Sequence, residues 1–154
     1  MKSESTPKEF SHLDPSGNAR MVDVSAKPDS QRQAIAEGRL TCATHTIELL
    51  RAKALPKGDV LTVAQIAGVQ GAKATSTLIP LCHPLAINGA ELKFTVEDDG
   101  ILIRATIRTT GKTGVEMEAL TAVSVAALTL YDMCKAVDKT MSIGGIHVVE
   151  KRKE

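Results

Sequence analysis

Residues 117–137 constrain the fold more than any other part of the sequence. They read "MEALTAVSVAALTLYDMCKAV", and their apolar side chains surround the whole circumference of a predicted helix instead of forming one stripe. The Ala and Thr content, together with Asp132 and Lys135, makes the stretch too weakly apolar for a membrane span. Such a helix needs cover beyond one face of a sheet, which indicates a subunit interface.

The strands are indicated by period-two alternation. Residues 91–109 alternate apolar and polar side chains on both sides of "EDDG", which predicts a β-hairpin. Residues 141–150 alternate again and predict a last strand. Residues 32–42, "RQAIAEGRLTC", could form a helix or a strand, and the β-like pattern with Gly38 favours a strand.

Two further helices are predicted between the first strand and the hairpin. Residues 43–55 have apolar positions at helical spacing, and residues 59–79 start at a plausible N-cap, Asp59, and stop before Pro80. The order is then strand, helix, helix, strand, strand, helix, strand. It predicts an α+β fold, a ferredoxin-like split βαβ sandwich whose antiparallel sheet carries helices on one face, plus one extra helix.

The 154 residues fit one domain, which we place at 21–154, preceded by a flexible polar tail at 1–20 with a turn at "DPSG". A net charge of +1 and an aromatic content of 2% argue against nucleic-acid binding. An anionic ligand would therefore need a local cluster of cations. Three cysteines without a CxxC pair, and no apolar run in "MKSESTPKEF", predict a reduced cytoplasmic protein.

The stretch "TTGKTGVEMEAL" contains Gly111-Lys112-Thr113, which looks like the end of a phosphate-binding loop. A Walker loop needs a glycine five residues earlier, where this chain has Thr106, and a buried parallel strand before it. Two alternatives remain: a flexible turn, or a turn whose free amides hold an anion at a helix start. No catalytic role is predicted for Lys112.

Two pairs of charged residues lie at opposite ends of the apolar helix. Glu116 and Glu118 complement the helix dipole, and their i, i+2 spacing directs them to different sides, so that Glu118 could face a pocket. Asp132 and Lys135 share a side, either as a helix-end ion pair or as a lysine acid or base with a carboxylate neighbour. The fourteen residues from Glu118 to Asp132 span about 21 Å of helix. A pocket that uses both would be shared between subunits.

The segment "LIPLCHPL", residues 78–85, holds Cys82 and His83 between two prolines. Adjacent residues of an extended segment point to opposite sides, which disfavours a Cys-His nucleophile pair, and His83 could simply bond to backbone. Lys57 and Lys73 lie near glycines and could reach over a pocket or remain solvated. The other Cys and His residues are too scattered to predict a metal site: Cys42, Cys134, His12, His45 and His147.

In this order, "MVDVS", "KGDV", "LIPLCHPL", "TGKTGVEMEALTA" and "YDMCKAVDK" are similar to the motifs of the MoaC family of molybdenum cofactor biosynthesis, over residues 21–149. The resemblance implies a ferredoxin-like subunit in a homohexamer, a trimer of dimers, with active sites at subunit interfaces. It also implies a phosphorus-oxygen lyase that converts 3′,8-cyclo-7,8-dihydro-GTP, supplied by a radical SAM enzyme, to cyclic pyranopterin monophosphate and pyrophosphate. No redox cofactor is expected, and the residues do not decide whether Mg²⁺ assists.

The resemblance also assigns the site. Asp132, Lys57 and Lys135 are the expected catalytic residues, and the substrate pocket is expected to contain Leu81, Cys82, His83, Met117, Glu118, Glu116, Arg32 and Lys73, with Asp23 a weaker candidate.

These residue types suit the reaction. Cations would stabilise the charge that develops as pyrophosphate leaves. We expect Lys57 and Lys135 to transfer protons, with a lysine pKa lowered by neighbouring cations and with Asp132 positioning Lys135. His83 and Glu118 would hold the purine or ribose edge. The rival prediction is a non-catalytic hexameric carrier of a pterin or nucleotide on the same fold.

Overall fold

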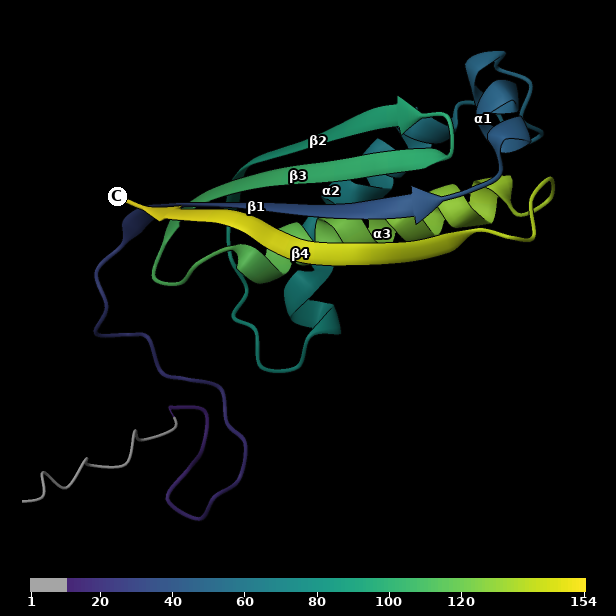
Figure 1. Ribbon diagram of the computed structural model, residues 1–154. Helices are drawn as coiled ribbons and strands as arrows, with labels where there is room; N and C mark the ends of the chain where they lie inside the picture. The colour runs from purple at the N-terminus through teal and green to yellow at the C-terminus, as the bar shows by residue number, and fades with distance from the viewer. Residues whose placement is uncertain (1–10) are drawn as a thin grey trace, which may run out of the picture.

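The computed structural model describes residues 11–154, and its elements follow the predicted order (Figure 1). They are β1 (Ser30–Thr41), α1 (Thr44–Arg51), α2 (Val60–Leu78), β2 (Ile87–Glu97), β3 (Gly100–Gly111), α3 (Glu116–Cys134) and β4 (Ser142–Lys153). The uncertain segment at 32–42 is therefore a strand as far as residue 41.

The four strands form one antiparallel sheet in the order β2-β3-β1-β4. Helices α2 and α3 lie against one face of this sheet, and α1 lies beyond its end (Figure 1). Because β3 pairs between β1 and β2, the two βαβ units are split, as the ferredoxin-like arrangement requires. The predicted fold class is confirmed.

The core is built from small and branched aliphatic side chains. Alternate residues of β1 and β3 face the helices, and α3 contributes fully buried positions between them. This core includes Ala34, Ala36, Leu40, Ile103, Ala105, Ile107, Ala122, Val123 and Ala126. Helices α2 and α3 approach closely because α2 has glycines at the contact: a Cβ at Gly68 would lie 3.1 Å from the Ala122 carbonyl oxygen, and a Cβ at Gly71 would lie 2.8 Å from Val125 Cγ2.

Helix α3 is long and apolar enough to cross a membrane by length and composition alone, but most of it is packed in the core. Its outer side is not covered within one chain, since Leu128 is 61% exposed. Helix α2 adds exposed apolar residues, with Ile66 at 58% and Leu78 at 56%. This exposure agrees with the expectation that one face of the sheet cannot cover the apolar helix at 117–137.

Several predicted boundaries were wrong by a few residues. Helix α1 stops at Arg51 instead of Leu55, because Lys53 takes a left-handed backbone conformation with φ of 54°. Helix α3 stops at Cys134, with Lys135 as its C-cap. Strand β4 continues to Lys153, since its last residues pair with β1.

The N-terminal turn is as predicted where the structure describes it. The Asp14 carbonyl oxygen accepts from the Gly17 amide at 2.9 Å, and Gly17 has the positive φ of 84° that favours glycine. The first ten residues of the predicted tail lie outside the described residues. The three cysteines of the chain are free thiols.

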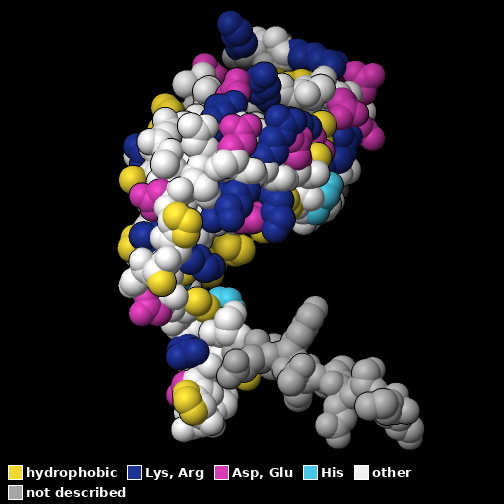
Figure 2. Space-filling model, turned by 90° about the vertical axis from the view of Figure 1, so that its left-hand side faces the viewer, with side chains coloured by type: hydrophobic (Ala, Val, Ile, Leu, Met, Phe, Trp, Pro, Cys, Tyr) yellow, Lys and Arg dark blue, Asp and Glu magenta, His cyan; other side chains and the backbone are white. Residues whose placement is uncertain are grey.

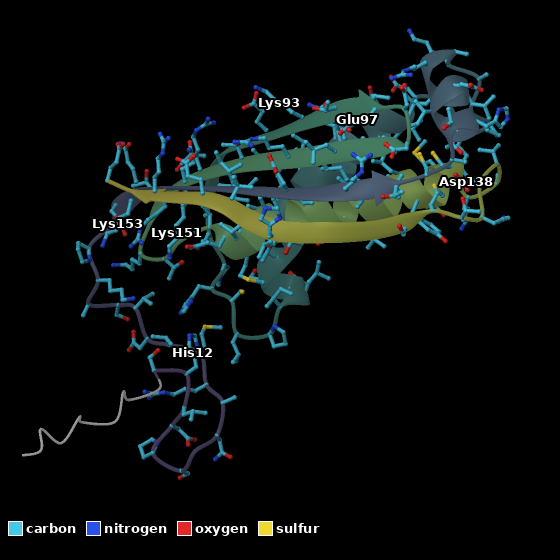
Figure 3. The ribbon with its side chains drawn as sticks, viewed as in Figure 1. His12, Lys93, Glu97, Asp138, Lys151 and Lys153 are labelled. Atoms are coloured by element: carbon cyan, nitrogen blue, oxygen red, sulfur yellow. The ribbon has the colours of Figure 1, made fainter. Side chains whose placement is uncertain are left out.

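A buried carboxylate joins the segment after α3 to the start of α1. Asp138, 5% exposed and labelled in Figure 3, follows α3 and accepts from the Ala43 amide, the Thr46 hydroxyl and both the amide and hydroxyl of Thr140 at 2.7 to 2.8 Å. Burial alone would raise its pKa, but these hydrogen bonds outweigh burial and hold the pKa of Asp138 well below its usual range.

Asp138→Asn should destabilise the fold by about 1 to 3 kcal/mol, because an amide nitrogen would face the donors of Ala43 and Thr46. The folded-state pKa is depressed, so the stabilisation is complete above the unfolded carboxyl pKa of about 3.9 and is lost as pH falls toward the folded-state value. Urea unfolding of wild type and variant from neutral to acid pH measures this.

The matched control is Asp98→Asn, which removes an ion pair with Arg51 at 2.9 Å whose Asp98 side chain is 85% exposed. That change should cost less than about 1 kcal/mol. Equal losses in the two variants would contradict the anchoring role of Asp138.

Candidate functional site

A cavity of about 280 Å³ lies at the N-terminal end of α3. Helix α2 ends before Pro80, and the extended segment that follows passes in front of the first turn of α3. Six predicted pocket residues line this one cavity: Leu81, Cys82, His83, Glu116, Met117 and Glu118. The structure therefore brings together residues 81–83 and 116–118, which are more than thirty positions apart in sequence.

Glu118 is the buried acid of this cavity. It is 4% exposed, and burial raises the pKa of its carboxyl, with a smaller contribution from the charge of Glu116. Glu118 thus keeps its proton to a higher pH than an ordinary glutamate and can donate a hydrogen bond. Glu116 also lines the cavity, but its side chain is 31% exposed and lies 3.5 Å from the Lys151 ammonium. The two glutamates thus differ in exposure and in partners, although both line this cavity.

His83 bonds to backbone and also lines the cavity. Its Nε2 lies 2.5 Å from the Val22 carbonyl oxygen, and because a carbonyl only accepts, Nε2 carries the proton. The neighbouring Cys82 thiol has a pKa raised by burial and by the charge of Glu118. A thiol with a raised pKa is a poor nucleophile, which agrees with the sequence argument against a Cys-His pair.

A second cluster lies at the C-terminal end of α3. Asp132 Oδ1 is 2.7 Å from the Lys135 ammonium, and Asp132 Oδ2 is 3.2 Å from the Lys57 ammonium. Lys57 also donates to the Asp132 carbonyl oxygen at 3.2 Å. The structure thus joins all three expected catalytic residues, although Lys57 is 75 residues from Asp132 in sequence.

The opposite charges in this cluster stabilise one another's ionised forms. Hydrogen bonds from Lys135 and then Lys57 lower the pKa of Asp132, and the hydrogen bond to Asp132 raises the pKa of Lys135. The predicted lowering of a lysine pKa is wrong for Lys135. Its nearest charge within the chain is a carboxylate and not another cation, so its ammonium form is favoured.

The two clusters do not meet within one chain. Helix α3 is unbroken from Glu116 to Cys134. At the standard rise, the fourteen residues from Glu118 to Asp132 separate them by about 21 Å. This agrees with the separation expected from the sequence.

Arg32 and Lys73 lie apart from both clusters. Arg32 donates to the Lys112 carbonyl oxygen at 3.2 Å, and its buried Nε has no hydrogen-bond partner among the described residues. Arg32 lines a further cavity of about 350 Å³ together with Arg108 and Arg152. Figure 2 shows several Lys and Arg side chains at this end of the sheet, with Asp and Glu side chains among them. Lys73 is exposed on α2 and lines neither cavity.

Sequence reasoning missed part of the cavity wall. Val22, Val24 and Lys27 line the cavity at the start of α3, and Asp23 lines a shallower hollow beside His83. The motif "MVDVS" contains three of these residues, but nothing in its spacing indicates which side chain it would meet.

The turn at Gly111-Lys112-Thr113 is not a Walker loop. Strand β3 is antiparallel to both neighbours, and the Glu116 carboxylate lies over Gly114, so the helix start already faces an anion. The alternative of an anion held by these amides is disfavoured. Over residues 11–154, no three His, Cys, Asp or Glu side chains converge in a way that could hold a metal ion.

The family model described as "MoaC family" matches residues 21–154 of this chain. The chain belongs to the MoaC family. It is 57% identical over 144 residues to the cyclic pyranopterin monophosphate synthase of Desulfitobacterium hafniense, covering 93% of the chain and 88% of that relative. It is 56% identical over 146 residues to the synthase of Chloroflexus aggregans, covering 94% and 88%.

A third relative is longer. The chain is 59% identical over 143 residues to the molybdenum cofactor biosynthesis bifunctional protein of Chlorobaculum tepidum, covering 93% of the chain but 46% of that protein. The chain thus spans about half the length of the bifunctional relative, and the similarity of nearly the whole chain to the MoaC family confirms the resemblance inferred from its motifs.

Asp132→Asn should lower the pKa of Lys135, because it removes the carboxylate that stabilises the ammonium form. The pKa is read from the ¹³Cε chemical shift of labelled lysine as pH is raised. As a control, Glu91→Gln removes the carboxylate 3.5 Å from Lys93 on β2 and should leave Lys135 unchanged. An unchanged Lys135 titration in Asp132→Asn would contradict the coupling.

Proposed function

We propose that the chain is a cyclic pyranopterin monophosphate synthase, which converts 3′,8-cyclo-7,8-dihydro-GTP to cyclic pyranopterin monophosphate with release of pyrophosphate. The observation that carries this is the meeting of Lys57, Asp132 and Lys135 at the end of α3 in a MoaC family member. The names of the relatives that are 57% and 56% identical support it.

The lysine cluster suits the phosphate chemistry. Pyrophosphate departure and cyclic phosphate formation develop negative charge, which ammonium groups stabilise. Asp132 holds both ammonium groups and favours the charged form of Lys135. Lys57 and Lys135 are therefore both assigned as cations that can donate a proton.

The cavity at the other end of α3 suits the base and sugar. The buried Glu118 carboxyl, whose pKa is raised by burial, can hydrogen-bond a purine or ribose edge, and His83 offers a fixed ring beside it. Arg32 adds positive charge at this end of the molecule, and we assign it to the substrate triphosphate. Lys73 is assigned to the same substrate from a neighbouring subunit.

Assembly completes the site in this proposal. The two clusters are about 21 Å apart in one chain by the helix rise, so the cavity of one subunit meets the lysine cluster of another in a homohexamer, a trimer of dimers. The exposed apolar residues of α2 and α3, including Ile66, Leu78 and Leu128, support burial against further copies. A radical SAM enzyme would supply the substrate, and the reaction would run in the cytoplasm without a redox cofactor.

The test is incubation of wild type and Lys57→Ala with 3′,8-cyclo-7,8-dihydro-GTP, following pyrophosphate and the pterin product with EDTA and with Mg²⁺. We expect turnover by wild type and a loss on the order of a hundredfold or more in the variant, with substrate binding retained. Lys93→Ala, an exposed lysine on β2, is the control and should keep full activity. Binding without pyrophosphate release by wild type would instead support a carrier.

Complementation tests the shared site. Lys57→Ala and Glu118→Ala chains, each inactive alone, are co-expressed with different tags and the mixed assemblies purified. If each site takes one cluster from each of two subunits, random pairing restores about one quarter of the sites. If each site lies within one chain, the mixture stays inactive, and the shared-site proposal is wrong.

A further inference from the structure

Lys112 precedes Thr113, which lines the cavity at the start of α3, and it contacts the segment that forms one wall of that cavity. It lies in the loop between β3 and α3, and its side chain is 38% exposed. Its ammonium donates to the Lys27 carbonyl oxygen at 2.7 Å and to the Ser25 carbonyl oxygen at 3.4 Å, and it lies 3.9 Å from Asp29 Oδ1. One side chain therefore engages three residues of the segment before β1.

The segment at 21–29 depends on such contacts because it contains no helix or strand. Within the described residues, its hydrogen bonds and ion pairs to the rest of the domain come from two side chains, His83 to Val22 and Lys112 to residues 25–29. Its other hydrogen bonds are local, such as those of Ser25 to Asp23. Yet Val22, Val24 and Lys27 form one wall of the cavity.

The backbone of Lys112 makes a separate contact, with Arg32 of β1. Its carbonyl oxygen accepts from Arg32, the only hydrogen bond that the structure gives the Arg32 guanidinium among the described residues. A lysine suits the tether because three donors on a flexible stem can satisfy several carbonyl oxygens at once. The same residue thus contacts the cavity wall through its side chain and, through its carbonyl oxygen, an arginine that lines the separate cavity at the end of the sheet.

We propose that Lys112 is a positioning residue whose side chain fixes segment 21–29 as the outer wall of the substrate cavity. This inference rests on the proposed function and adds a residue to it. Lys112 does not touch the reacting atoms in this arrangement; it determines where the wall lies when substrate binds.

The first test is hydrogen exchange without substrate, on the millisecond timescale and resolved to residues 21–29, in wild type, Lys112→Met and Lys112→Arg. We expect faster exchange confined to 21–29 in Lys112→Met, and near wild-type exchange in Lys112→Arg, which keeps the charge and several donors. Lys93→Met removes an exposed lysine on β2 (Figure 3) and serves as the control. Equal exchange in wild type and Lys112→Met overturns the inference.

The second test separates positioning from general stability. For Lys112→Met we expect KM for 3′,8-cyclo-7,8-dihydro-GTP to rise roughly tenfold, the size of one lost charge-assisted hydrogen bond, with kcat within about threefold and recovery in Lys112→Arg. Loosened exchange with unchanged KM also overturns the inference, because the wall would then be mobile without consequence for binding. If wild type itself releases no pyrophosphate, the proposed function fails, whereas the exchange result still decides whether Lys112 holds the wall.

Discussion

The packing of α3 against the sheet is the constraint on which the other features depend. Its buried alanines let the helix lie close to β1 and β3, and Gly68 lets α2 approach it on the other side. Because α3 is one unbroken helix, the residues at its two ends are fixed relative to one another. The acid-lined cavity and the lysine cluster are therefore two ends of one rigid element, and the fold determines their separation.

The order of elements could be predicted because each has a local signal. Alternation defined the hairpin, Asp59 caps Thr62 as expected at the start of α2, and Pro80 follows its end. The ends of α1 and β4 could not be predicted. The local sequence indicates neither the left-handed conformation of Lys53 nor the pairing of the last residues of β4 with β1. The four-strand order follows from chain geometry once the elements are known.

The site was predictable only in part. The spacing of Asp132 and Lys135 on a helix indicated that the two residues share a side, and the structure agrees. The contact of Lys57 with Asp132, and of His83 with Val22, joins residues 75 and 61 positions apart, where local sequence carries no information. The lysine pKa argument failed for a related reason: it assumed cationic neighbours, whereas the nearest group to Lys135 is a carboxylate.

The way Lys57 is held has a consequence for the energetics of binding. Its ammonium contacts both the carboxylate and the carbonyl oxygen of Asp132, in the last turn of α3, where the helix dipole is negative. One carboxylate between two ammonium groups leaves a surplus of one positive charge, held by the helix end. Folding therefore offsets the repulsion between the two lysines before an anion binds. The positive charge is preorganised, so anion binding costs little reorganisation free energy.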